Sequence, residues 1–184
     1  TQPLWNLQDT APFHASATRD EVQDAEKDIE TLLDGVGLAP GSAMPELGER
    51  NSNTSADLDS LAKFVLTGIR VPNATTITSQ QEERGREVFL KAGCSQCHAG
   101  THWTISALPS SPSTISSVEI TSALRDVGTA TSHDVLGTKG FDVPTLLGLD
   151  SSAPYLHDGS AQSLEAVLKN PNHAPALTET ELAD

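Results

Sequence analysis

The run "GCSQCHAG" at residues 93–100 contains both cysteines of the chain, and it constrains fold and chemistry more than any other stretch. Two thiols three positions apart, followed at once by an imidazole, suit covalent haem attachment, a thioredoxin-type redox pair or half of a zinc site. Cys94 and Cys97 can bond to the two vinyl groups of a haem as thioethers, while His98 binds the iron. This hypothesis explains every reactive residue of the run, and it is the leading one.

The alternatives need neighbours that this sequence supplies less well. A thioredoxin pair belongs in a βαβ unit, whereas the segment before Cys94 is predicted to be helical. A zinc-stapled interaction domain needs four ligands, so it would have to recruit His98 and His102. A disulfide between Cys94 and Cys97 would close too short a loop to restrict the unfolded chain much.

Composition favours a haem over a large core of side chains. The chain has 184 residues, of which 36% are hydrophobic and only 4% aromatic. A haem would add a large apolar surface to such a thin core. The net charge of −14 argues against nucleic acid or an anionic membrane as partner, and it favours a basic docking partner.

The sequence predicts neither a membrane span nor a retained export signal. No stretch approaches the roughly eighteen apolar residues that a transmembrane helix needs. A signal peptide is also not visible, although haem attachment to such a motif normally follows export. We therefore expect a mature or trimmed chain in the periplasm or another extracytoplasmic compartment.

Five segments show the capping residues and apolar periodicity of helices. The predicted helices begin near Thr18, Ser55, Ser79, Ser163 and Thr178, and they end near Gly35, Ile69, Gly93, Leu168 and the last residue. Residues 99–145 are instead rich in Ser, Thr, Gly and Pro and show no sustained helical period. A loop of that length is usually disordered or wrapped around a functional group, and a bound haem would be such a group.

An internal repeat is also predicted. The stretch "LWNLQDTAPFHASATRDEV" resembles "LLGLDSSAPYLHDGSAQSLEAV" from residue 146, with a gap of one residue between Phe13 and His14 that places His14 on His157. Likewise "TSADLDSLAKFV" resembles "TETELAD". Because only the second copy is preceded by Cys-x-x-Cys-His, we expect a chain cut at both ends from a larger protein whose first haem lies upstream.

With "GREVFLKAGCSQCHAG", "VPTLLGLDSSAPYLHDGSAQSLEAVL" and "TRDEVQDAEKDIE", the chain resembles the bacterial di-haem cytochrome c peroxidase and MauG-like family. The resemblance covers nearly the whole chain and is strongest from residue 81 onward. It implies a mostly α fold. A cytochrome c-like haem domain with long irregular loops would cover residues 79–184, its last helix truncated. Before it would come the helical remainder of a second such domain, residues 1–72, and a linker, residues 73–78.

The resemblance also implies a role. In the family the second domain carries the haem that relays electrons, so the chain would be an electron-transfer module with one covalent haem c. Its partner would be a redox protein or a neighbouring haem domain. The alternative is an oxidoreductase, a peroxidase or MauG-like enzyme that works with an upstream haem. The carboxylate of the peroxidatic pocket would also lie upstream, so we assign no catalytic residue here.

The sixth position on the iron follows from the same resemblance. Relatives place a Met, Tyr or His shortly after the Tyr-x-His-Asp-Gly run, where this chain has His173. Met44 lies before the haem motif and far from that place. We therefore predict His98 and His173 as axial ligands of the iron. His157 is the alternative distal ligand, or else it orders its loop, and an open or water-bound position is the third possibility.

Two further predictions concern groups around this site. The calcium ion that family members often hold at the domain interface would here contact the backbone carbonyls of Ser152 and Pro154. His14, His102 and His133 are predicted to be loop histidines, although His102 is close enough to His98 in sequence to be compared with the structure.

Overall fold

The computed structural model describes the parts of the chain that surround the cysteine motif and both copies of the repeat. The described residues are 4–5, 7–15, 17, 19–26, 51–71, 76–106, 124–130 and 140–184. Their regular structure is helical, with no strand, and three isolated β-bridges join irregular segments. The helical elements in chain order are η1 (Val22–Glu26), α2 (Ala56–Thr67), α3 (Ser79–Lys91), η2 (Cys94–Gln96), η4 (Leu149–Ser151), α5 (Leu164–Leu168) and α6 (Glu179–Ala183). The prediction of a mostly α chain is confirmed at this level.

Hydroxyl side chains begin the longer helices largely as the sequence predicts. Ser55, Ser163 and Thr178 are the N-caps of α2, α5 and α6, and each side-chain oxygen accepts a backbone N–H three residues on. The predicted capping box of α3 is wrong by one residue. Its N-cap is Thr78 rather than Ser79, and the returning side chain is Gln81 rather than Glu82.

The first predicted helix is described only in part. Its start at Thr18 and residues 27–50 lie outside the described residues, and so does Met44. The part from Val22 to Glu26 is a 3-10 helix, η1, rather than a turn of α-helix. Residues 99–106, 124–130 and 140–145 are irregular, as predicted, and the remainder of the long loop is likewise outside the described residues.

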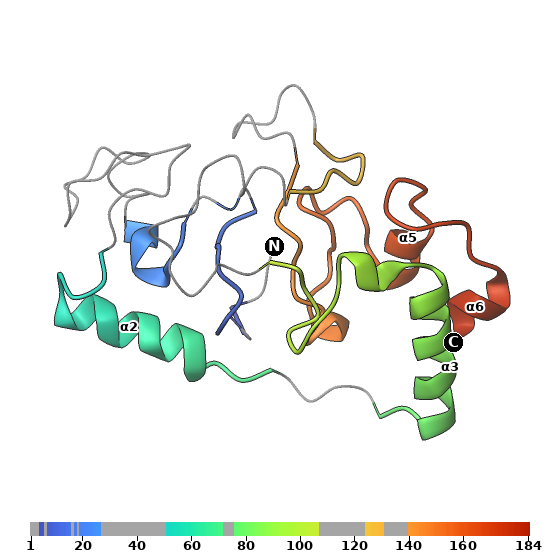
Figure 1. Ribbon diagram of the computed structural model, residues 1–184, viewed down its shortest axis with the longest axis horizontal. Coiled ribbons are helices and arrows are strands. Elements are labelled where there is room, and N and C mark those ends of the chain that lie inside the picture. Colours follow the sequence, from blue (N-terminus) through green and yellow to red (C-terminus); the bar gives the residue numbers. More distant parts are fainter. Residues whose placement is uncertain are drawn as a thin grey trace.

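Helices α3 and α6 pack against each other through a glycine. A Cβ atom at Gly85 would lie 2.9 Å from the carbonyl oxygen of Asp184, so only glycine permits this approach. Arg84 Nε binds Asp184 Oδ1 at 2.6 Å, and Lys91 Nζ binds Glu181 Oε1 at 2.5 Å. Figure 1 shows α3 and α6 side by side at one end of the molecule, while α2 lies at the other end.

The two copies of the repeat follow the same backbone path. The bridge between Phe13 and Arg19 has its counterpart between Tyr155 and Ala161. Peptide bonds Ala11–Pro12 and Ala153–Pro154 are both cis, and η1 matches α5 in length and position. All of these pairs keep one constant offset along the chain, so the copies align without a gap.

This alignment corrects the predicted one-residue gap. His14 has φ 70° and its counterpart by backbone is Leu156, with φ 65°, rather than His157. The N–H of Ala17 donates to the carbonyl of His14 at 3.0 Å, and the N–H of Gly159 donates to the carbonyl of Leu156 at 3.2 Å. The turn geometry, rather than the shared histidine, therefore sets the correspondence, and Ala15 matches His157.

The first copy docks onto the start of the second copy and the segment that leads into it. The N–H of Asp142 donates to the carbonyl of Ala15 at 2.7 Å, and the indole N–H of Trp5 donates to the carbonyl of Leu147 at 3.3 Å. Gly148 has φ 74°, and a side chain there would collide with the Trp5 indole. The first copy therefore lies against residues 142–148, near the middle of the molecule (Figure 1).

No helix within the described ranges is long and apolar enough to cross a membrane.

Candidate functional site

The two cysteines and His98 lie in one tight turn at the end of α3. Helix α3 ends at Lys91, and Gly93 then takes the left-handed conformation with φ 77°, which reverses the chain into η2. The N–H groups of Cys97 and His98 both donate to the carbonyl of Cys94, at 3.2 and 2.9 Å. Both thiols are free and partly buried. The turn thus presents two sulfurs and one imidazole within a single hydrogen-bonded loop.

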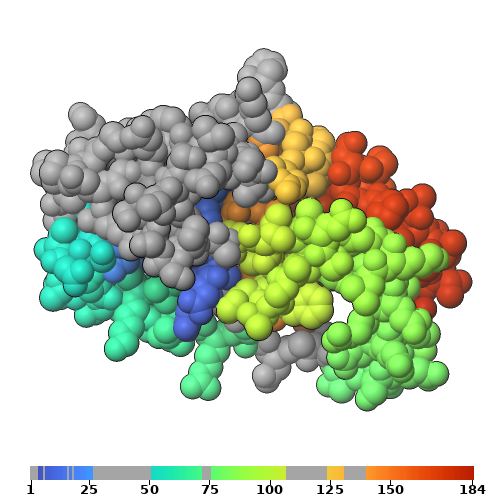
Figure 2. Space-filling view, in the orientation of Figure 1, coloured from blue at the N-terminus to red at the C-terminus, as the bar shows by residue number. Residues whose placement is uncertain are grey.

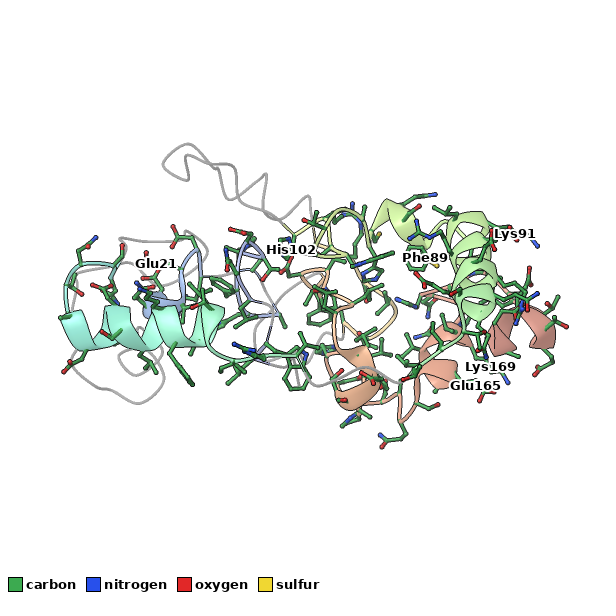
Figure 3. All side chains as sticks on the ribbon, turned by 90° about the horizontal axis from the view of Figure 1, so that it is seen from below. Glu21, Phe89, Lys91, His102, Glu165 and Lys169 are labelled. Carbon is green, nitrogen blue, oxygen red and sulfur yellow. The ribbon has the colours of Figure 1, made fainter. Side chains whose placement is uncertain are left out.

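His98 is buried and its ring is oriented by backbone carbonyls. Its Nδ1 lies 3.3 Å from the carbonyl oxygen of Trp103. Because a carbonyl can only accept, Nδ1 carries the proton in this contact and Nε2 keeps its lone pair. Trp103 is itself held by Phe89, whose ring meets the indole edge-on at 5.5 Å and 83°. Figure 3 shows Phe89 on the side of α3 that faces these irregular segments.

The segment that supplies the Trp103 carbonyl is tied to the segment before the second copy of the repeat. The Thr104 hydroxyl donates to the carbonyl of Val143, and the Thr145 hydroxyl donates to the carbonyl of His102 at 2.6 Å. The N–H of Ile105 donates to the carbonyl of Cys97 at 2.9 Å. These bonds fix the position of the His98 ring relative to the second copy.

His173 lies close to His98, as the sequence predicts for an axial pair. It follows α5, and its N–H donates to the carbonyl of Asn170 at 3.0 Å. The two imidazole centroids are 6.3 Å apart and their planes differ by 56°. Its Nδ1 is buried and has no hydrogen-bond partner among the described residues.

The ring separation can be compared with that of two imidazoles bound to one metal. With metal–nitrogen bonds of about 2 Å, and about 1.2 Å from nitrogen to ring centre, two opposed imidazoles have centroids about 6.4 Å apart. The separation found here is 6.3 Å. Ordinary packing of rings also covers this distance, so the ligand assignment remains a prediction that the geometry fits.

Both imidazoles are held in the neutral form that a metal ligand requires. Burial lowers the pKa of His98, and His173 nearby lowers it further, whereas the carbonyls of Trp103 and Pro144 act in the opposite direction. Burial likewise lowers the pKa of His173, against a smaller opposite effect of the Val167 carbonyl. Neutral imidazole offers a lone pair, so both rings can bind a metal without first losing a proton.

His157, the alternative distal ligand, is engaged elsewhere. Its ring stacks on Phe141 with centroids 3.6 Å apart and an angle of 19°. Its Nδ1 lies 2.9 Å from the hydroxyl oxygen of Thr129. These contacts suit the other role that the sequence allows for it, a residue that orders its loop.

The chemistry of the thiols bears on the two alternatives without haem. Burial raises the pKa of Cys94, and the neighbouring Cys97 raises it further, whereas a reactive redox thiol needs a lowered pKa. Across the described ranges, no three His, Cys, Asp or Glu side chains gather in a way that could hold a metal ion. Neither the thioredoxin-type pair nor the four-ligand zinc site therefore gains support from the described residues.

The remaining predicted residues lie around this centre. His102 lines an open cavity of about 450 Å³ with Asp9 of the first copy, Arg70 from just after α2 and Leu147 of the second copy. Its Nδ1 lies 3.1 Å from the Thr101 hydroxyl, and Figure 3 shows it between the two ends of the molecule. His133 is outside the described residues. Calcium at the carbonyls of Ser152 and Pro154 remains a prediction.

Sequence reasoning missed the backbone carbonyls that orient His98, and it missed a buried carboxyl. Asp142 lies between the two copies, where it accepts the Ser106 hydroxyl at 2.8 Å, and burial raises its pKa to about 7. The Thr10 carbonyl oxygen lies 3.1 Å from the same Ser106 hydroxyl and shares its single hydrogen. Every residue has a backbone carbonyl, so the sequence does not show which carbonyls contact His98. An Asp in a loop rich in Ser and Thr is normally exposed, so its burial was not expected.

Comparisons with known proteins give one distant similarity. The chain is 27% identical over 129 residues to the gamma subunit of hydrazine synthase from Kuenenia stuttgartiensis. The match covers 56% of this chain and 36% of that subunit, so it involves only about a third of the relative. No protein-family model matches the chain. No solved structure matches it either.

Proposed function

We propose that this chain is a c-type cytochrome that carries one covalently bound haem c and transfers electrons. The observation that carries the proposal is the placement of His173 beside His98, with ring centroids 6.3 Å apart, next to the turn that holds both thiols. A cytochrome c-like haem domain over residues 79–184 belongs to the same proposal. The group when bound supplies the reversible one-electron chemistry of iron.

The two cysteines would anchor the haem. Each thiol would add its sulfur to one carbon of a vinyl group and its hydrogen to the other, so attachment needs no oxidant. The raised pKa of Cys94 keeps that thiol protonated and therefore able to supply its hydrogen. Since η2 places the two cysteines in one turn, they would together hold the haem through its two vinyl groups.

His98 and His173 would set the kind of chemistry. If both neutral imidazoles bound the iron, no position would remain for peroxide or another small molecule. Without a thioether sulfur from methionine, the reduced state is less favoured and the potential is low. Val143 and Trp103 hold the His98 side rigidly through hydrogen bonds of the loop, which suits a centre that changes charge without changing shape.

The parent protein and its location are part of the proposal. The resemblance to di-haem cytochrome c peroxidases supports a larger protein in which this haem serves a neighbouring haem domain or a redox partner. Covalent attachment at a Cys-x-x-Cys-His run supports an exported, periplasmic location. The net charge of −14 supports a basic surface on the partner.

A second candidate is a part of a multi-subunit oxidoreductase. The similarity to a hydrazine synthase subunit favours it, because that relative is named as a subunit of an enzyme. In this case the residues around His98 would still relay electrons, and the substrate would be handled elsewhere in the assembly. The two candidates therefore share the same haem and differ in the partner.

The test is an intact mass and a visible spectrum of the purified chain and two variants. We expect the mass of one haem above that of the polypeptide, and pigment that stays with the protein in acidified acetone. The wild-type spectrum should show sharp, split α and β bands when reduced, which indicate low-spin iron. His173→Ala should convert it to high-spin, and His157→Ala is the matched control that should leave it low-spin.

Each outcome decides one part of the proposal. A colourless chain, or pigment that the acid acetone removes, would refute covalent haem. A low-spin spectrum that persists in His173→Ala but is lost in His157→Ala would reassign the distal ligand to His157. High-spin iron in the wild type would instead indicate an open position and favour the enzyme.

A further inference from the structure

A single hydroxyl hydrogen lies between two acceptors where the first copy meets the rest of the chain. Ser106 Oγ is 2.8 Å from Asp142 Oδ2 and 3.1 Å from the carbonyl oxygen of Thr10. A serine hydroxyl has one hydrogen, so it cannot serve both oxygens fully at the same time. Thr10 belongs to the first copy, and the nearby carbonyl of Ala15 accepts the N–H of Asp142 at 2.7 Å. The position of this hydrogen therefore affects how firmly the first copy is held.

The three groups are fixed in place and largely removed from water. Ser106 is 5% and Thr10 is 7% exposed, and Asp142 is partly buried. The N–H of Ser106 donates to the hydroxyl oxygen of Thr104 at 2.8 Å, which holds Ser106 between its two acceptors. Figure 2 shows the first copy (blue) next to the residues that lead up to 106 (yellow-green). The arrangement is thus a built contact between distant parts of the chain.

The protonation state of Asp142 decides which acceptor receives the hydrogen. As a carboxylate Asp142 can only accept, and its charge makes it the stronger acceptor for the Ser106 hydroxyl. The carbonyl of Thr10 then lacks the one donor that the described residues offer it, which is costly for a buried group. As a neutral acid Asp142 has a hydrogen of its own. The N–H of Val143, which also contacts the carboxyl, can only donate, so Ser106 Oγ is the acceptor at hand.

We infer that a proton taken from solvent by Asp142 completes a chain of two hydrogen bonds, from Asp142 to Ser106 Oγ and from the Ser106 hydroxyl to the Thr10 carbonyl, which fastens the first copy. We call this chain the Ser106 relay. The relay forms when the proton binds and breaks when it leaves, and no other covalent bond changes. The Thr104 hydroxyl joins the segment of Asp142 to the loop that orients His98, so the proton also affects the support of the cysteine motif. The inference does not depend on haem.

The surroundings of Asp142 place this proton near neutral pH. Burial raises the pKa of the carboxyl to about 7, against the opposing effects of the Ser106 hydroxyl and the Val143 N–H. A detached and solvated carboxyl would have its ordinary pKa of 3.8. The docked first copy therefore keeps a proton that the detached one releases, and docking weakens as pH rises toward 7.

Other charged or titratable groups lie on the segments packed around Asp142, and none is among the causes of its pKa shift. They are Asp9, His14 and Arg19 of the first copy, His98 and His102 before Ser106, and Arg125 and His157 beside Phe141. Histidines as a class change charge between about pH 5 and 8, so the test has to separate them from Asp142.

The test is carbon-13 NMR of the whole labelled chain between about pH 5 and pH 9, on both sides of the Asp142 pKa. Reducing conditions keep any low-spin haem iron diamagnetic. The side-chain carboxyl carbon of Asp142 reports its protonation, and the carbonyl carbon of Thr10 moves downfield when that carbonyl gains a hydrogen bond. We expect both carbons to titrate with the same midpoint, with the Thr10 carbon downfield at low pH.

Three variants separate the relay from its alternatives. Asp142→Asn carries an amide N–H that donates to Ser106 as the neutral acid does, so the Thr10 carbon should keep its low-pH position throughout. Ser106→Ala removes the relay while Asp142 still titrates, so the Thr10 carbon should no longer respond to pH. Asp126→Asn is the matched control at an exposed carboxylate that accepts three backbone N–H groups, and it should leave both titrations unchanged.

Any of three results would overturn the inference. The first is a Thr10 carbon that stays constant while Asp142 titrates. The second is a Thr10 shift that survives Ser106→Ala, which would assign the shift to one of the histidines. The third is an Asp142 carboxyl that titrates near its ordinary value of 3.8, because the relay would then be broken at neutral pH. Wild type and Asp142→Asn decide alone if circular dichroism shows that Ser106→Ala loses its helices.

Discussion

In the first copy of the repeat the turn passes through His14 and Ala17, and in the second copy through Leu156 and Gly159, all with positive φ. The backbone bonds that close the two turns are equivalent, although little of the side-chain chemistry is shared. The path is set by main-chain hydrogen bonds, which any residue can make. Side chains at matched positions can therefore differ without changing the backbone. Only the second copy lies next to His173, which follows its helix α5.

The copies also differ in what holds them to the segment between them. At matched positions, Ala15 accepts the N–H of Asp142 through its carbonyl, while His157 stacks on Phe141. The first copy is therefore held by a backbone N–H of Asp142, and by the Asp142 carboxyl through Ser106, whereas an imidazole holds the second copy. Changing each support separately tests whether the copies are held independently.

The largest expected effect is at Asp142. Its pKa is about 7 in the folded chain and 3.8 when unfolded, because burial disfavours the carboxylate. The folded chain therefore binds an extra proton between these values, and the stability from the neutral carboxyl is lost as pH rises toward 7. Asp142→Asn should remove this loss, so its advantage over wild type should grow by up to about 3 kcal/mol from about pH 5 to pH 8. Guanidinium unfolding at several pH values measures it.

Asp126→Asn is the control of opposite sign. Asp126 is exposed and accepts the N–H groups of Gly128, Thr129 and Ala130, and these bonds lower its pKa. Its stabilising effect is present above the unfolded pKa and is lost as pH falls through the folded one. If wild type and Asp142→Asn follow the same pH profile, Asp142 is not the group that couples protonation to docking of the first copy.

A smaller effect is expected at Asp24 and its counterpart Ala166. Asp24 is fully buried and its carboxylate accepts the N–H of Asn51 at 3.1 Å, whereas Ala166 is exposed. Asp24→Ala leaves a buried donor without its acceptor and should lower the free energy of unfolding by about 2 kcal/mol. Ala166→Asp should change it by less than about 0.5 kcal/mol. Equal effects at both positions would mean that the copies share packing as well as backbone.

The smallest effect is expected at Gly159. The matching residue of the first copy is Ala17, which has φ 56° and is only 3% exposed. A Cβ atom at Gly159 would touch Pro154 at 3.4 Å, an ordinary contact. Gly159→Ala should therefore cost about 1 kcal/mol, the low end of the strain of a left-handed residue. Thermal unfolding measures it, and a cost of several kcal/mol would show that the turns are not interchangeable.

Features encoded by local residue types were predictable from the sequence. Ser55, Ser163 and Thr178 each cap a helix, because a hydroxyl oxygen just before a helix accepts a backbone N–H that has no partner within the helix. The capping residue of α3 was misplaced because Thr78 and Ser79 are adjacent and both are followed three residues later by a suitable partner. The proximity of His98 and His173 followed from a family resemblance rather than from spacing.

Features that depend on distant backbone could not be predicted. The predicted gap in the repeat was wrong because the alignment was made to pair His14 with His157. The turn that sets the true correspondence is formed by backbone bonds, which no particular residue type reveals. The carbonyls of Trp103 and Val167, which act on the pKa values of the two imidazoles, are likewise invisible in a sequence. The burial of Asp142 arises only when residues 10–15 and 140–143 come together.

The contact between Trp5 and the Leu147 carbonyl has a practical consequence. The chain has two tryptophans, and the other, Trp103, sits against Phe89 beside His98. Replacing either one by phenylalanine leaves a single tryptophan, which can be excited selectively beside Tyr155. One such protein would signal detachment of the amino-terminal repeat, and the other would signal loosening around the cysteine motif, so the order in which these regions come apart could be timed in stopped flow without any dye.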